Sequence, residues 1–401
     1  MNKNAKSHYL LKGVNAVLLT VACLSISNAL SAEWSVHGFA AQGVSKAANS
    51  NFINDDGKTS LNLTELGVNA SYQFSPSIRL AGQAVYLNGG NRYEEGARID
   101  YLLLDWTVAT DFDSQLNLYI GRYKNQHWLY SSTRDVPHTR PSIILPQSVY
   151  YDIFRDVALG SDGIALAYTT MTDIGEIDLL WSYGKSPISD SASELLVSKY
   201  AQGDVNQDFT HQASIYYRPK SSAWQFGASV LDSDFNYTAS SMEPFINADA
   251  TSQRVMFNML YSGQKWEFAA ELLQERFLFN GFLSPDTHPD KKGQGFYLQS
   301  RYFVDDKWSV LARYDRFDTD KNDRKGHKLN AESGGYIPSY FGYIYDTTLG
   351  VKYRVANNWQ IQAEYHWIEG RARLSPAIIP DLQVNNDKNW NMWAVQLMYW
   401  F

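Results

Sequence analysis

The chain has 401 residues and a formal net charge of −7, with 35 lysines and arginines against 42 aspartates and glutamates. This acidic balance argues against a nucleic-acid partner, because such a partner requires a basic surface. Mean hydropathy is −0.36, and beyond the N-terminal segment no stretch approaches the roughly twenty apolar residues of a transmembrane helix, which excludes a helical membrane protein.

Residues 1–32 have the pattern of a secretory signal peptide that is cleaved on export. Three lysines precede an apolar run over 14–26, and Ser31 and Ala32 supply the small residues of a cleavage site before residue 33. The sole cysteine, Cys23, lies in this run, so the mature chain has no disulfide. A lipoprotein signal cleaved before Cys23 is the alternative, but Thr20 stands where such a signal favours leucine. We expect 33–401 to form one mature domain.

The mature chain predicts about sixteen strands, joined alternately by short turns and long loops. Apolar and polar residues alternate in each strand, as expected where one face meets a non-aqueous medium. Trp or Ile follows most of the short turns, at 78, 224, 266, 308 and 359. Such residues are typical of a membrane interface. The predicted strands are 36–45, 61–74, 78–87, 98–109, 115–123, 163–169, 177–184, 210–218, 224–230, 254–261, 265–274, 296–303, 308–315, 345–354, 359–368 and 390–401.

The last predicted strand has an uninterrupted apolar face. It consists of Trp393, Val395, Leu397, Tyr399 and the terminal Phe401. This ending resembles the C-terminal signature of Gram-negative outer-membrane β-barrel proteins. The resemblance implies an outer-membrane location with both termini periplasmic, contact with membrane lipid and lipopolysaccharide, and recognition of this strand by the barrel-assembly machinery.

We therefore expect an all-β fold, a transmembrane antiparallel up-and-down β-barrel of about sixteen strands. A propeller has a similar repeat length, but it needs four strands per repeat and would not give one apolar face per strand. The last strand of a soluble sandwich is the alternative for the C-terminal segment alone. With about sixteen strands the lumen is too wide for side chains to fill, so an aqueous channel is the default.

The alternation also predicts which side chains face the lumen. If Trp359 and Ile361 face lipid, then Gln360, Gln362, Glu364 and His366 face inward. By the same argument Met392, Ala394, Gln396 and Met398 line the last strand. The charged and amide side chains predicted to face the lumen from the other strands are Arg79, Asp105, Asp178, Glu267, Glu271, Gln299, Arg301, Arg313 and Lys352.

Residues 124–162, after the fifth strand, break the alternation. They contain Pro137, Pro141 and Pro146, which a central strand would not tolerate. The position and length resemble the third extracellular loop of trimeric porins, which folds into the lumen and forms the constriction. The resemblance implies that opposite charges face each other at the narrowest point, from Arg134, Arg140 and Arg155 and from Asp135, Asp152 and Asp156.

This loop departs from the general porins, because their compact acidic motif is not recognisable in it. Its arginines, prolines and aromatic residues are closer to those of substrate-selective porins. An alternative is a packed inward plug, held by Ile143, Ile144, Leu145, Tyr150 and Tyr151, in which the arginines and aspartates only satisfy one another. The two interpretations are compatible, because a loop must be pinned to define a pore.

The predicted function is a porin, a water-filled channel for passive diffusion of small hydrophilic solutes that is filtered at 124–162. The alternatives are a pore selective for anions or acidic solutes, and a non-conducting barrel for adhesion or surface interaction. Family resemblance implies a homotrimer, and the small-residue faces of 36–45 and 163–169 suit a protein contact. The mature histidines are scattered outside any nucleophile motif, so we expect no enzyme. No metal or cofactor motif is present.

Overall fold

The computed structural model describes residues 34–153, 155, 160–188, 193–194, 196–198, 200–286, 288–374, 376 and 380–401. Short 3-10 helices, η2 (Gly90–Arg92), η3 (Pro137–Thr139) and η4 (Ser339–Gly342), and helix α4 (His327–Glu332) lie in the connections between strands. The strands are β1 (Trp34–Ala48), β2 (Thr64–Ser75), β3 (Ile78–Asn88), β4 (Gly96–Thr110), β5 (Ser114–Lys124), β6 (Gly160–Thr172), β7 (Gly175–Lys185), β8 (Asp204–Pro219), β9 (Trp224–Thr238), β10 (Ala248–Ser262), β11 (Trp266–Gly281), β12 (Asp290–Phe303), β13 (Trp308–Asp318), β14 (Tyr343–Ala356), β15 (Trp359–Gly370) and β16 (Asn389–Trp400).

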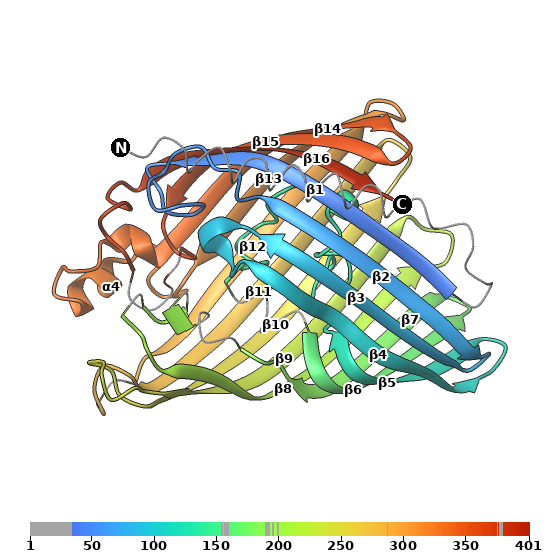
Figure 1. Ribbon diagram of the computed structural model, residues 1–401, viewed down its shortest axis with the longest axis horizontal. Coiled ribbons are helices and arrows are strands. Elements are labelled where there is room, and N and C mark those ends of the chain that lie inside the picture. The colour runs from blue at the N-terminus through green and yellow to red at the C-terminus, as the bar shows by residue number, and fades with distance from the viewer. Residues whose placement is uncertain are drawn as a thin grey trace, which may run out of the picture.

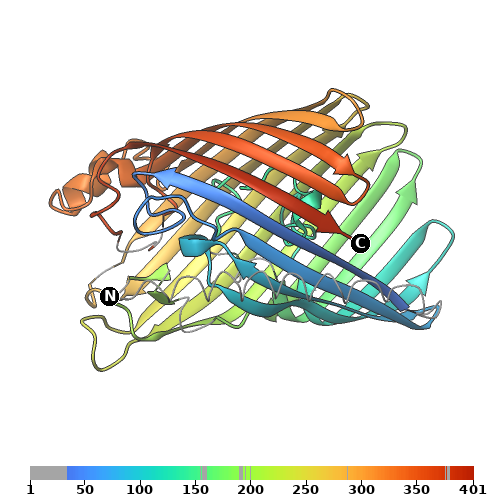
Figure 2. The ribbon, with the colours of Figure 1, turned by 45° about the horizontal axis from the view of Figure 1, so that its top comes forward.

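The sixteen strands form one closed antiparallel barrel in which each strand pairs with its neighbours in sequence (Figures 1 and 2). The barrel closes between β1 and β16, where Phe39 lies opposite Trp400 and Ala48 lies opposite Asn391. Phe401 continues this pairing, because its N–H donates to the carbonyl of Gly38 over 3.0 Å. The expected fold class is therefore confirmed, and each predicted strand overlaps an observed one.

The two faces of the wall differ as the alternation predicts. On β15, Trp359 and Ile361 are exposed outward, whereas Gln360, Gln362, Glu364 and His366 are buried inside. On β16, Met392, Ala394, Gln396 and Met398 are buried inside. Exposed apolar side chains surround the barrel and include Trp34, Trp266 and Trp308 near the short-turn end. A soluble protein rarely exposes so large an apolar surface, so this exterior suits lipid.

Several strands extend further toward the long loops than the sequence predicts. Strand β8 begins at Asp204 rather than residue 210, β11 continues to Gly281, and β12 begins at Asp290. The added parts of β8 and β12 are polar on both faces in many places, whereas β11 continues with the consecutive apolar residues Phe277, Leu278 and Phe279. In neither case do apolar and polar residues alternate, although the ladder of main-chain hydrogen bonds continues. The prediction of loops in these stretches was wrong for that reason.

The predicted small-residue face of 163–169 is also corrected. Ala165 is fully buried and points inward, whereas Ile164 and Leu166 are exposed on the outside of β6. On β1 the outward positions do include Ala40, which is partly exposed, and Gly38, which the ring of Phe401 covers. Small residues thus reach the exterior on β1 but not over this part of β6.

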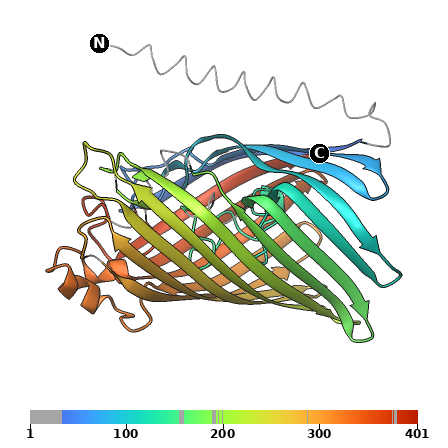
Figure 3. The ribbon, with the colours of Figure 1, turned by 90° about the horizontal axis from the view of Figure 1, so that it is seen from below.

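The long connections gather at one end of the barrel and the short turns at the other (Figure 3). Among the described residues, no helix is long and apolar enough to cross a membrane. The connection between β5 and β6 turns inward.

Candidate functional site: the loop inside the barrel

The connection between β5 and β6 begins at a row of glycines. Gly121, Gly163 and Gly184 lie opposite one another on β5, β6 and β7. Gly121 has φ +117°, and a Cβ there would lie 2.5 Å from the carbonyl oxygen of Leu102. A Cβ on Gly163 would lie 2.2 Å from the Tyr183 carbonyl oxygen. Only glycine fits these positions without strain, and the chain leaves the wall just beyond them. We call residues 125–153 and 155 the inner loop.

The first part of the inner loop crosses to strands β8–β11. The amide of Gln212 on β8 donates to the carbonyl of Gln126 over 3.0 Å, and the Ser229 hydroxyl on β9 lies 2.8 Å from Nδ1 of His127. The N–H of Leu129 donates to the Glu271 carboxylate on β11 over 3.0 Å. The loop therefore contacts the wall on the side away from its own strands, which places it inside the barrel (Figure 2).

The Glu271 carboxylate also joins the two ends of the inner loop. The hydroxyl of Tyr150 donates to it over 2.5 Å, and the Tyr297 hydroxyl on β12 donates over 2.8 Å. In addition, the N–H of Tyr130 donates to the Tyr150 hydroxyl over 3.0 Å. One buried side chain of the wall thus organises two loop segments about twenty residues apart in sequence.

The middle of the inner loop is fixed to β13–β15. The N–H groups of Ile143 and Ile144 both donate to Glu364 on β15, over 2.8 and 2.7 Å. Arg313 on β13 donates to the Ser142 hydroxyl over 2.7 Å and to the Ile144 carbonyl over 3.1 Å. Lys352 on β14 donates to the Arg140 carbonyl over 2.9 Å. The wall side chains therefore satisfy main-chain groups that have no ladder partner.

Apolar contacts complete this attachment. Ile143 and Ile144 lie in a buried cluster with wall residues such as Phe317, and with Ile53 and Leu374 from the loops at the long-loop end. On the neighbouring strand β16, Trp400 stacks on His138, with ring centroids 4.4 Å apart and an interplanar angle of 11°. The inner loop is thus packed against several sectors of the wall.

Buried ion pairs occupy the centre of the inner loop. Asp152 accepts from Arg134 over 2.8 Å and from Arg92 over 2.7 Å. Asp135 pairs with Arg155, and it lies 3.1 Å from the ammonium of Lys124. These side chains are nearly inaccessible to solvent. A buried pair is costly to break, since the remaining partner becomes an uncompensated charge.

Burial and neighbouring charges together set the protonation of Asp152, His127 and His138. Burial alone would raise the pKa of Asp152, but Arg92 and then Arg134 hold the pKa of this carboxyl below its ordinary value. Burial, with a smaller contribution from Arg254, lowers the pKa of His127 to about 3. Burial next to Lys352 and Arg140 lowers the pKa of His138 to about 4. At neutral pH the loop therefore holds an ionised aspartate and two neutral histidines.

The structure brings some of the predicted site residues together and separates others. Arg134, Asp135, Asp152 and Arg155 form the central cluster, whereas Arg140 pairs with Glu65 on β2 over 2.6 Å. Asp156 lies outside the described residues. The packing residues predicted for a plug are all buried, namely Ile143, Ile144, Leu145, Tyr150 and Tyr151.

The cations predicted to line the wall differ in how far solvent reaches them. Arg313 is buried and bound to the inner loop, and Arg301 pairs with Glu267 over 2.5 Å and is mostly shielded. Arg79 pairs with Asp105 over 2.9 Å but keeps 47% of its side chain exposed. Arg79 is therefore the most accessible of the predicted cations.

The sequence did not identify Arg92 or Glu65 as partners of the loop. Arg92 lies in a polar loop and Glu65 on an otherwise ordinary strand, so neither carries a local signal. Glu271 and Glu364 were predicted to face the lumen, but their contacts with loop N–H groups were not predicted. Within the described part of the chain, no group of three or more His, Cys, Asp or Glu side chains could hold a metal ion.

No protein-family model matches the sequence, and no curated protein matches it. Solved structures do match. OmpT, an outer membrane protein of Vibrio cholerae, folded in vitro, aligns with a TM-score of 0.56 and 13% identity over 92% of this chain and 97% of its own. The outer membrane channel DcaP of Acinetobacter baumannii gives a TM-score of 0.57 and 11% identity, with the same coverage.

An anion-selective porin from Comamonas acidovorans aligns with a TM-score of 0.54 and 11% identity, over 92% of this chain and 99% of its own. Identities this low establish the fold only, and alignment over nearly the whole length of each structure extends the likeness to the complete barrel. The chain therefore has the sixteen-stranded fold of the porin-like outer-membrane barrels.

Proposed function

We propose that this protein is an outer-membrane channel through which small hydrophilic solutes diffuse down their gradients. The observation that carries the proposal is a closed barrel with an apolar exterior, a polar interior and a loop fixed inside it. The signal peptide, residues 1–32, would direct export. The short turns and both termini of the mature chain would then lie at the periplasmic side.

The inner loop would set the size limit of such a channel. Because its main chain is bound to β11, β13 and β15 through Glu271, Arg313 and Glu364, the opening is the part of the lumen that remains beside it. The central arginines and aspartates are buried and paired, so they would fix the shape of the opening rather than meet the solute directly. Charges that keep solvent exposure, such as Arg79, would act on the solute.

A selective pore is the second candidate, and the close packing of the inner loop favours it. A loop anchored around much of the wall leaves a narrower passage than a free loop does. Selectivity for anions would then depend on accessible cations, of which Arg79 and Arg218 have 47% and 41% of their side chains exposed. Arg134, Arg140 and Arg155 would contribute only indirectly, because they are buried and do not reach the passage.

We propose no enzymatic activity. His127 and Ser229 lie 2.8 Å apart, but both side chains are buried. The Nδ1 of His366 lies 2.7 Å from Asp346 and 3.1 Å from the Thr348 hydroxyl. Its Nε2 lies 3.1 Å from the Glu364 carboxylate, and the ring is fully buried. Both nitrogens therefore contact acids, and no position remains for a substrate beside a nucleophile.

Single-channel recording in planar bilayers tests the proposal. Stepwise conductance with little ion preference would support a general diffusion pore, and a strong anion preference would support the selective one. Purified, folded protein that never conducts would overturn both and would favour a barrel that serves surface interaction.

We also propose a homotrimer that assembles through the exterior of β1–β4. Small residues, including Ala70, Gly82 and Ala84, form a shallow groove there beside Trp34 and Tyr72. Small side chains allow two flat sheets to approach closely. Chemical crosslinking in mild detergent should give a trimer, and a species that remains monomeric under all conditions would contradict this assembly.

A further inference from the structure

The connection between β15 and β16 begins with a short buried segment, residues 371–374, which we call the strap. Strand β15 ends at Gly370, which has φ +94°, and a Cβ there would lie 2.1 Å from the carbonyl oxygen of Tyr343. Only glycine fits this turn without strain. The N–H of Ala372 donates to the same carbonyl over 3.0 Å, so the chain turns off β15 at a fixed point.

Arg371 holds the near end of the strap. Its side chain is buried and donates to the carbonyl of Asn49 over 2.7 Å. It also donates to the Asp387 carbonyl over 2.7 Å and to the amide oxygen of Asn385 over 3.0 Å. These partners belong to the loop after β1 and to the end of the β15–β16 connection itself. The near end is therefore tied to the loops beside the closure of the barrel.

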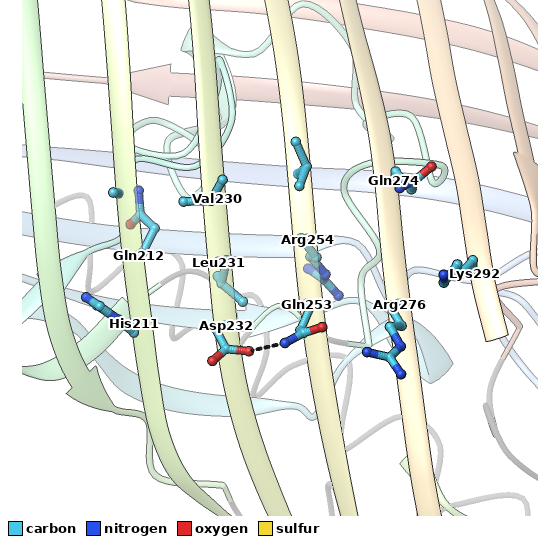
Figure 4. Close-up of a pocket in the computed structure, with 12 residues that line it drawn as sticks. His211, Gln212, Val230, Leu231, Asp232, Gln253, Arg254, Gln274, Arg276 and Lys292 are labelled. Atoms are coloured by element: carbon cyan, nitrogen blue, oxygen red, sulfur yellow. Dashed lines mark hydrogen bonds between the residues drawn. The ribbon is translucent and has the colours of Figure 1, made fainter. Parts of the chain in front are cut away.

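Arg373 holds the far end of the strap on a different part of the wall. Its guanidinium donates to the Glu275 carboxylate on β11 over 2.8 Å, and Arg254 on β10 lies 3.5 Å from the other oxygen of that carboxylate. Figure 4 labels Arg254 on β10, beside the part of β11 that follows Gln274 and contains Glu275. Strands β12, β13 and β14 lie between β11 and β15. With about 4.8 Å between neighbouring strands, the ion pair connects parts of the wall about 19 Å apart along its circumference.

Two aromatic rings complete the contacts of Arg373. The guanidinium lies 3.6 Å from the ring centroid of Phe317 on β13 and 4.5 Å from that of Tyr151 in the inner loop. Such contacts are favourable because the face of an aromatic ring attracts a cation. Gly293 and Gly295 on β12 make room for the Phe317 ring, since a Cβ on them would lie 3.0 and 3.1 Å from it. One guanidinium thus contacts the wall and the inner loop together.

The backbone of Arg373 is strained. Its φ is +75°, in the left-handed region that residues with a Cβ rarely adopt. Such a conformation persists only where its surroundings impose it. Here the ion pair and the two rings impose it on a side chain that is 8% exposed. The two apolar residues of the strap add to the constraint, because they share a buried cluster with Ile143 and Ile144 of the inner loop.

We propose that Arg373 is a positioning residue of the channel, which joins the strap to the second half of the inner loop so that the two segments define the opening as one body. The inference rests on the proposed function and adds a second segment to the constriction. Without the guanidinium, the far end of the strap would leave β11 while Arg371 kept the near end attached. Tyr151 would lose a contact that holds the inner loop.

Thiol labelling of the complete folded protein tests this coupling without any need for conductance. The sole cysteine, Cys23, lies in the predicted signal peptide, so a cysteine introduced into the mature chain would be its only thiol. Buried reporters are Ala372→Cys in the strap, Ser148→Cys in the inner loop and Ser214→Cys on the inner face of β8. We expect Arg373→Gln to raise the rate of reaction with a membrane-impermeant maleimide about tenfold or more at the first two positions, because a buried ion pair is broken and the segments open locally. The wall reporter should not change.

Further variants control for a general loss of structure. Arg373→Lys keeps a charge for Glu275 but lacks the planar group that stacks on both rings, so its labelling rates should be intermediate. Lys388→Gln breaks an exposed ion pair with Glu369 at the end of the same connection, and it should change no rate. Faster labelling of the strap alone would overturn the coupling, and so would unchanged labelling of both segments. Faster labelling of the wall reporter would mean that the whole barrel had loosened, which would also overturn it.

Conductance separates failure of this inference from failure of the proposed function. In a conducting protein, Arg373→Gln should admit larger polyethylene glycols than the unchanged protein and Lys388→Gln do. A protein that never conducts but shows coupled labelling would contradict the channel and support the coupling. A conducting protein whose strap and inner loop stay unlabelled in Arg373→Gln would contradict the coupling alone.

Discussion

The barrel wall and the inner loop satisfy the hydrogen bonds of their main-chain polar groups in different ways. In the wall, N–H and carbonyl groups of neighbouring strands bond to each other, as between β10 and β11 from Ala248 to Ser262. In the inner loop, carboxylates of the wall accept the N–H groups. Glu364 accepts two of them and Glu271 one, together with two tyrosine hydroxyls.

This difference determines how each region responds to substitution. The wall distributes its bonds over the main chain, so a change of one side chain removes few of them. The inner loop concentrates its bonds on a few acids and arginines, so one side chain can hold several groups. We therefore expect the loop to be sensitive at a small number of positions, and its release to be separable from unfolding of the barrel.

The largest loss of loop stability is expected for Asp152→Ala. The substitution would leave the buried guanidinium groups of Arg92 and Arg134 without their shared carboxylate, at a cost of about 3–5 kcal/mol in loop stability. Trypsin should then cleave after Arg134, which is 1% exposed in the native loop. Asp56→Ala, which breaks an exposed pair with Lys58, is the control and should leave the loop resistant.

The same carboxylate predicts the response of the loop to acid. The pKa of Asp152 is held below its ordinary value. Its contribution to loop stability is therefore present at pH values above the ordinary pKa, and it is lost as pH falls through the lowered pKa. Protease resistance conferred by this group should therefore persist to about pH 4 and fall below it. Resistance of Asp152→Ala equal to that of the unchanged protein would contradict the role of this pair.

A smaller effect is expected for Glu364→Ala, which removes the acceptor of the Ile143 and Ile144 N–H groups. Two buried donors without partners should cost about 2–4 kcal/mol, and the middle of the inner loop should detach from β15. Single-channel conductance should then rise and fluctuate. Glu364→Gln keeps one acceptor oxygen and should show an intermediate change. Unaltered conductance in both variants would mean that the channel does not pass beside this part of the loop.

The lowered pKa of His127 predicts that protease resistance of the inner loop declines gradually as pH falls. Burial lowers its pKa to about 3, so the unfolded loop binds a proton near pH 6.5 while the packed loop does not. The contribution of neutral His127 to the stability of the packed loop is therefore complete above about pH 6.5, and it declines as pH falls toward the lowered pKa. His127→Asn should flatten the decline of protease resistance in that range. His288→Asn, at an exposed position, should leave it unchanged.

The wall was predictable from the sequence because its burial follows a period of two. The set from Trp359 to His366 shows this most clearly, with mostly apolar side chains outward and amide and ionisable side chains inward. The same rule fails in the outer parts of β8 and β12, where both faces are polar, and in that of β11, where Phe277, Leu278 and Phe279 follow one another. Alternation reports a difference between two environments, and it gives no signal where the environments are alike.

The inner loop was predictable in position but not in its partners. Three prolines and the loss of alternation located it, and the apolar residues from Ile143 to Tyr151 indicated packing. Nothing local connects Asp152 with Arg92 or Arg140 with Glu65, since these pairs are separated by 60 and 75 residues. Such pairs depend on how the closed barrel presents its inner face, which no short sequence window contains.

The smallest effect on stability, and a distinct effect on transport, is expected for Arg79→Gln. Its ion pair with Asp105 is partly exposed, so solvent screens it and its loss should cost below about 1 kcal/mol. Removing an accessible positive charge from the lumen should nevertheless shift the reversal potential under a salt gradient toward cation preference. Trypsin resistance should stay unchanged, in contrast to Asp152→Ala. A shifted reversal potential with an intact loop would assign ion discrimination to accessible wall charges and pore shape to buried loop pairs. If instead Arg134→Gln shifts the potential while its loop stays resistant and Arg79→Gln has no effect, the permeating ions pass close to the central cluster, and the division between the two regions is wrong.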